Sequence, residues 1–98
     1  MSDDFFAPPP FNVQEGLRRA ARELRPLGLA EREGVYERAG DPVIRLSADG
    51  STIRAEMVRE PMRSPQWKQR VLRNNGDLRD FLAEATKKIR IWNDDGDE

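Results

Sequence analysis

The stretch VIRLSADGSTIRAEMV, residues 43–58, decides the fold because apolar and polar residues alternate on both sides of an Asp-Gly pair. Side chains of a strand point alternately to opposite faces of a sheet. Asp49-Gly50 is a strong signal for a tight hairpin turn, since both residues tolerate the positive φ that such turns demand. The stretch therefore predicts a β-hairpin with strands at about 43–47 and 52–58.

The register of this hairpin follows from the requirement that one face be apolar. An even loop pairs Leu46 with Ile53, whereas an odd loop would set Leu46 against Thr52 and spoil that face. We therefore predict the even register with Asp49-Gly50 as its loop. The predicted buried face consists of Ile44, Leu46, Ile53, Ala55 and Met57.

The opposite face of the predicted hairpin places Arg45 and Arg54 side by side. Like charges directly opposite each other weaken a sheet unless an anion lies nearby. Glu37 or Glu56 of the same sheet could supply that anion, and so could a carboxylate or phosphate of a partner. Arg45 and Arg54, with Tyr36 beside them, are therefore candidate partner contacts.

A short strand at about 35–38 precedes the hairpin, and residues 39–42 form the turn between them. An even loop would bury Val35 and Glu37, whereas an odd loop would bury Tyr36. We favour the odd loop because burying an unpaired carboxylate costs more than exposing a valine.

A first helix is predicted at about 13–25. Asn12 and Glu15 resemble a capping box, and Pro26 disfavours helical geometry in the residue before it. The apolar residues follow helical spacing and form one stripe for burial. They are Val13, Leu17, Ala20, Ala21 and Leu24.

Two further helices are predicted after the hairpin. Ser64-Pro65 resembles a helix start, so we expect a helix at about 65–74 that carries Trp67 and stops at Gly76. Asp77 would cap the last helix, at about 78–92. Its apolar stripe has the best helical periodicity in the chain. It consists of Leu78, Phe81, Leu82, Ala85, Ile89 and Trp92.

These elements predict an α+β fold, in which a three-stranded antiparallel meander packs against the helices in a single small domain. A chain of 98 residues can build one modest core but not two. We expect a flexible tail rich in aromatic residues and proline (1–11), the α+β domain (12–92) and an acidic tail (93–98).

Composition favours a cytoplasmic protein without membrane contact. The chain is 37% hydrophobic and 36% charged, and it has no apolar run near the roughly 18 residues of a membrane span. It begins MSDDFF, which is acidic, so we expect no secretory signal. With no cysteine, there is no disulfide framework.

The net charge of −1 conceals a segregation of charge. Residues 1–15 and 93–98 carry acids and no base, whereas all 17 lysines and arginines lie between 16 and 92. A basic body suggests nucleic-acid binding as an alternative function, although the pI near 5.6 is far below the value above about 9 that is usual for binders. The candidate contacts for this alternative are Arg59, Arg63, Lys68, Arg70 and Arg73.

Recognisable catalytic chemistry is missing from the sequence. The chain has no histidine and no cysteine, which removes the commonest general base, the commonest thiol nucleophile and most zinc sites. It also lacks a phosphate-binding glycine loop and a nucleophile elbow. We therefore predict a protein that is not an enzyme and that binds no cofactor or metal.

The remaining features favour protein binding. Three prolines, flanked by Phe5, Phe6 and Phe11, form a candidate docking segment, which could bind a partner or fold back on its own domain. A half-exposed Trp67 would join the contact surface, and a meander leaves strand edges available. We predict a small non-enzymatic protein-interaction module, an adaptor or assembly subunit, with another protein as its partner and nucleic acid as the alternative.

Overall fold

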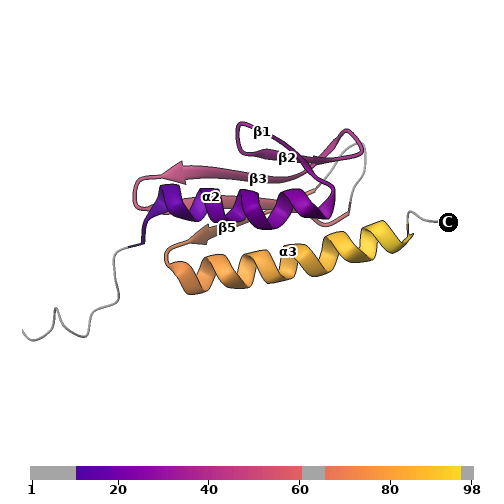
Figure 1. The fold of residues 1–98 in the computed structure, drawn as a ribbon. Helices are drawn as coiled ribbons and strands as arrows, with labels where there is room; N and C mark the ends of the chain where they lie inside the picture. The colour runs from indigo at the N-terminus through magenta and orange to yellow at the C-terminus, as the bar shows by residue number, and fades with distance from the viewer. Residues whose placement is uncertain (1–10, 61–65, 96–98) are drawn as a thin grey trace, which may run out of the picture.

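The computed structural model describes residues 11–60 and 66–95. Within these residues the strands form one five-stranded antiparallel sheet in the order β1-β2-β3-β4-β5, and the helices lie against one side of it (Figure 1). The predicted α+β class is confirmed, with more strands than expected. The elements are α2 (Val13–Leu24), the 3-10 helix η1 (Arg25–Leu27), β1 (Ala30–Arg32), β2 (Val35–Arg38), β3 (Asp41–Asp49), β4 (Thr52–Val58), β5 (Trp67–Leu72) and α3 (Asn75–Asp95).

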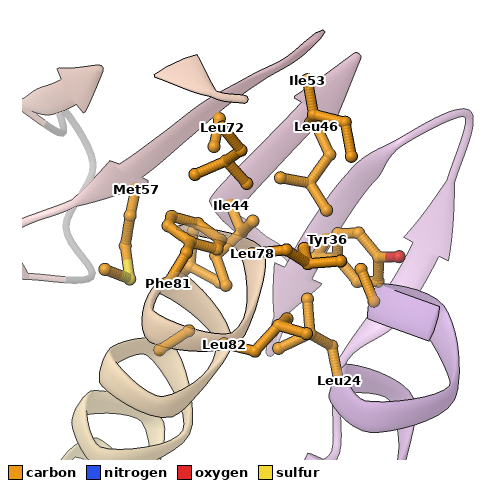
Figure 2. Close-up of a cluster of buried hydrophobic side chains, with 14 of the residues drawn as sticks. Leu24, Tyr36, Ile44, Leu46, Ile53, Met57, Leu72, Leu78, Phe81 and Leu82 are labelled. Carbon is orange, nitrogen blue, oxygen red and sulfur yellow. The ribbon is translucent and has the colours of Figure 1, made fainter. Parts of the chain in front are cut away.

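The core lies between the sheet and the two α-helices, as Figure 2 shows. All members of the predicted apolar face of the hairpin are buried, and Phe81 of α3 is the largest side chain that is fully buried. The stripe of α3 is buried as predicted up to Ile89, while Trp92 is partly buried. From α2 the buried apolar residues are Val13, Ala20 and Leu24.

The β3–β4 hairpin has the predicted buried face but different cross-strand pairs. Its loop is Gly50-Ser51, so Asp49 pairs with Thr52 and Leu46 with Ala55. The predicted Asp49-Gly50 loop and the Leu46–Ile53 pair are wrong by a shift of two, which leaves every side chain on its expected face. Gly50 has φ 62°, which suits the first position of a type II′ turn.

The β2–β3 connection resolves the question of Tyr36. The loop Ala39-Gly40 has an even length, yet Tyr36 is buried as predicted, because a bulge opposite Tyr36 and Glu37 adds one residue, Val43, to β3. Pro42 lies opposite Glu37 at this bulge, where its missing N–H costs least.

Ala39 is held in the left-handed region at φ 54°, followed by Gly40 at φ 90°. These angles define a type I′ turn, for which Asn-Gly is the preferred pair. We expect Ala39→Asn to raise the free energy of unfolding by about 1 kcal/mol, because asparagine tolerates this conformation better than alanine. Urea denaturation with an unchanged slope would measure the gain, and Ala39→Val should lower the midpoint. A lower midpoint for the asparagine variant would contradict the turn geometry.

The predicted helix at 65–74 is wrong, because residues 67–72 form strand β5 along β4. Its side chains alternate, so Leu72 is buried in the core while Val71 is exposed. Pairing with β4 therefore overrides the local helix signal at Ser64-Pro65, which lies outside the described residues. Strand β1 was also not predicted.

The N-terminal ends of both α-helices are capped by side chains. Asn12 Oδ1 accepts the N–H of Glu15 at 3.0 Å, which confirms the predicted cap of α2. In α3 the cap is Asn74 rather than the predicted Asp77, since Asn74 Oδ1 accepts the N–H of Asp77 at 2.8 Å. Gly76 accordingly lies in the first turn of α3 and does not end a helix.

The far end of α3 is bound to the sheet. The Arg38 guanidinium donates from Nη2 to the Trp92 carbonyl at 2.8 Å and from Nε to Asn93 Oδ1 at 2.9 Å. A cation at a helix C-terminus is favourable for both hydrogen bonding and the helix dipole. The helix continues to Asp95, beyond the predicted boundary at 92.

Candidate interaction surface

The face of the sheet that carries no helix is the candidate surface, and we call it the open face. Strand pairing places a row of side chains across it, one from each strand, with Val35, Arg45 and Glu56 at its centre. Two parallel rows flank this one. The open face consists of Arg32, Val35, Arg45, Ser47, Arg54, Glu56, Val58, Trp67, Gln69 and Val71.

Trp67 organises the open face. The guanidinium carbon of Arg45, on β3, lies 3.7 Å from the centroid of the Trp67 ring, on β5, so the two side chains meet across β4. Such a cation–π contact is worth about 0.5–2 kcal/mol. Val58 lies opposite Trp67 and is fully buried, as is Val43 of β3. Trp67 packs against the buried core cluster, to which both valines belong.

Two arginines of the open face, Arg45 and Arg54, lie beside carboxylates of the same chain. Arg45 lies opposite Glu56, with Nε 3.6 Å from the carboxylate, and Arg54 bonds Asp49 at 3.3 Å. The predicted Arg45–Arg54 pair is wrong, because the two-residue register shift separates these side chains. Glu56, one of the two internal anions considered, forms an ion pair with Arg45. Among the described residues, Arg45 Nε is buried without a hydrogen bond.

The other predicted partner contacts do not gather around Arg45. Phe11 packs against the core, and Phe5 and Phe6 lie outside the described residues. Tyr36 is buried on the helix-covered side of the sheet. Burial raises the pKa of its phenol, and the charge of Glu31 raises it further. The structure thus brings together Arg45, Trp67 and, one row away, Arg54.

The described members of the predicted nucleic-acid contacts lie on or next to β4 and β5. Lys68 and Arg70 point to the helix-covered side of β5, where Arg70 Nη1 lies 2.9 Å from Glu84 Oε1. Arg59 follows β4 and Arg73 follows β5. Arg63 lies outside the described residues. Lys68, Arg70 and Arg73 therefore follow the edge strand and Arg59 the strand beside it, so the described members do not form a single basic face.

Alternate backbone groups of β5 point away from β4. The N–H of Arg59 donates to the Gln66 carbonyl at 3.2 Å, so these two residues form a hydrogen-bonded pair of the antiparallel ladder. Such pairs alternate along a strand. The backbone groups of Trp67, Gln69 and Val71 consequently point away from β4, toward no partner among the described residues. We call this row of outward groups the β5 edge.

Two hollows flank α2. One of about 360 Å³ lies between α2 and the β1–β2 hairpin, with Leu17, Glu31 and Tyr36 in its lining. The other, of about 600 Å³, lies between the start of α2 and the β3–β4 turn. Within the part of the chain that the structure describes, no group of three or more acidic residues is placed to hold a metal ion.

Glu31 stabilises the β1–β2 turn beside the first hollow. Its carboxylate accepts the N–H of Gly34 at 3.0 Å and an N–H of Arg25 at 2.6 Å. The hydrogen bond from the Gly34 N–H is the largest cause that lowers the pKa of Glu31, followed by the hydrogen bond from Arg25. A lowered folded-state pKa adds stability above the unfolded value of about 4.3, and this stability is lost as the pH falls through the folded value.

We therefore expect Glu31→Gln to lower the free energy of unfolding by about 1 kcal/mol at neutral pH. The difference from the wild type should shrink as the pH falls below about 4. Urea midpoints at neutral and acidic pH measure both quantities. Glu23→Gln, which removes an exposed pair with Arg19, serves as the control with little effect at either pH. A difference that stays constant with pH would refute the role of the carboxylate.

Comparisons with known proteins identified no relative of this chain. A scan against family models gave no match, and searches of curated proteins and of solved structures gave none. In the described ranges, no helix combines the length and the apolar character that crossing a membrane requires.

Proposed function

We propose that this chain is a small non-enzymatic protein-interaction module, acting as an adaptor or assembly subunit, that binds its partner through the open face. The observation that carries the proposal is the helix-free face built around Trp67 and Arg45, with Val71 40% exposed at its margin. Tryptophan and arginine are enriched among the residues that dominate binding energy at protein interfaces.

The absence of histidine and cysteine from the sequence supports a role without catalysis. We propose that no cofactor is needed, because the open face carries a pre-arranged Trp67–Arg45 contact that can serve binding by itself. A cytoplasmic location is part of the proposal and rests on composition.

Nucleic-acid binding is the weaker candidate. Proteins that hold single strands stack bases on aromatic rings. Here Arg45 already lies over the Trp67 ring. Arg45 and Arg54, on the open face, each pair with a carboxylate of the same chain. These contacts favour a protein partner over a stacked base.

Photocrosslinking tests the proposal in cells that naturally produce the chain. A photoreactive amino acid at Val71 is expected to capture a discrete polypeptide, whereas the same amino acid at Arg22, exposed on α2, is not. Adding Trp67→Ala to the chain that carries the photoreactive amino acid at Val71 should reduce the amount of polypeptide captured. Capture that disappears with nuclease would instead support the nucleic-acid alternative, and equal capture at both positions would contradict the open face as the site.

A further inference from the structure

The β5 edge offers a template for another strand. The backbone N–H and C=O groups of Trp67, Gln69 and Val71 point outward in the plane of the sheet. Within residues 11–60 and 66–95 these groups have no partner strand, and such an edge can add a strand from another chain through main-chain hydrogen bonds. Proline is missing from 66–73, so nothing in the sequence of β5 blocks such pairing.

Charge along this edge selects the chemistry of the added strand. Lys68, Arg70 and Arg73 occur within residues 66–73, and no acidic residue does. Arg70 is bound by Glu84, whose other oxygen lies 4.0 Å from Lys88, so this neighbourhood stays basic overall. Carboxylates two residues apart on an incoming strand would lie beside Lys68 and Arg70.

A second copy of the chain fits this edge poorly. Antiparallel pairing of two β5 edges must align outward-pointing residues with one another. The register centred on Gln69 sets Lys68 opposite Arg70, and the neighbouring register centred on Arg70 sets Arg70 opposite its own copy. Like charges directly opposite each other destabilise a sheet, so an acidic partner is preferred over self-pairing.

We propose that the β5 edge binds an extended segment of a partner protein in which acidic and apolar residues alternate. This inference rests on the proposed function and names the partner's chemistry. The acidic residues lie on the helix-covered side beside Lys68 and Arg70. The apolar residues lie on the open face, where they pack against Trp67 and the exposed Val71.

The test uses short capped peptides and the isotope-labelled full chain. A peptide of alternating glutamate and valine is expected to shift the amide signals of Trp67, Gln69 and Val71 and to protect them from exchange. Two control peptides, one with lysine in place of glutamate and one with the glutamates grouped in a block, should leave these amides unchanged. Lys68→Glu is expected to weaken the acidic peptide about tenfold and to admit the lysine peptide.

A backbone variant separates strand addition from simple charge attraction. Gln69→Pro removes an outward N–H without removing a hydrogen bond to β4, so peptide binding should be lost while the circular dichroism spectrum is retained. If this variant does not fold, the exchanged charge preference of Lys68→Glu still decides the matter.

Several outcomes would overturn the inference. Equal binding of the blocked and alternating peptides would indicate charge attraction without strand addition, and displacement of the peptide by single-stranded RNA would indicate a nucleic-acid ligand. Protection of the edge amides by self-association would indicate a second copy. If Val71 captures a polypeptide in cells but the alternating peptide fails to bind, the inference fails and the proposed function stands; if both fail, both are rejected.

Discussion

Replacing Phe81 with alanine is expected to lower the free energy of unfolding by about 3–5 kcal/mol. Phe81 is the largest fully buried side chain and lies on α3 facing the sheet (Figure 2). A domain of this size has about 5–15 kcal/mol of stability, so one truncation removes a large part of it. Urea denaturation followed by circular dichroism measures the loss.

Ile91→Ala is the matched control, because Ile91 lies on the same helix and is 50% exposed. Its effect should be within about 0.5 kcal/mol of zero, as is usual for exposed sites. Equal midpoints for the Phe81 and Ile91 variants would mean that α3 does not pack on the sheet through the stripe described here.

Gly34→Ala is expected to cost about 2–5 kcal/mol, for two reasons that act together. Gly34 has φ +84°, and a Cβ at this position would lie 2.3 Å from the carbonyl oxygen of Leu46. That oxygen belongs to the backbone of β3, and the N–H of the same residue, Leu46, donates to the Gly34 carbonyl at 2.9 Å. The substitution must therefore push β3 away from the β1–β2 turn.

Gly28→Ala separates the two reasons. Gly28 has a similar φ of +90°, but no described atom lies within 4 Å of the added Cβ. Its cost should be the conformational part alone, about 1–2 kcal/mol. Equal unfolding midpoints for the two alanine variants would contradict the close approach of β3 to Gly34.

The alternation of apolar and polar residues was sufficient to predict which side chains of a strand are buried, where one face of that strand is apolar. In β3 and β4 the buried set follows from parity, and a shift of two residues leaves parity unchanged. The pairs themselves were mispredicted because Asp49 stays in the strand, where its carbonyl accepts the hydroxyl of Thr52 at 2.9 Å and its carboxylate bonds Arg54. Those contacts favour Gly50-Ser51 as the turn.

Strand β5 could not be predicted from local signals. Its residues WKQRVL contain both a helix-compatible composition and a period of two, and the helix-start signal before them was the stronger local cue. The strand forms because β4 has a second edge to satisfy, which is a tertiary effect. The glycine of Glu33-Gly34 was the available sequence signal for a turn before β2, and the structure places this pair at φ 51° and 84° between β1 and β2.

The candidate site was predicted in part. Arg45 and Trp67 were both named as contacts, but their stacking depends on β5 lying beside β4 and was not foreseen. Tyr36 was placed correctly inside the domain only because a bulge reversed the effect of an even loop. Neither bulges nor contacts across an intervening strand leave a reliable signal in a single sequence.

Residue-resolved amide exchange along β5 tests the open edge most directly. In the free chain, the amides of Lys68, Arg70 and Leu72 should be protected by β4, whereas those of Trp67, Gln69 and Val71 should exchange faster. Adding the alternating acidic peptide should slow the second group and leave the first unchanged. Uniform protection of residues 67–72 in the free chain, or the reverse alternation, would contradict an edge strand that presents its backbone to a partner.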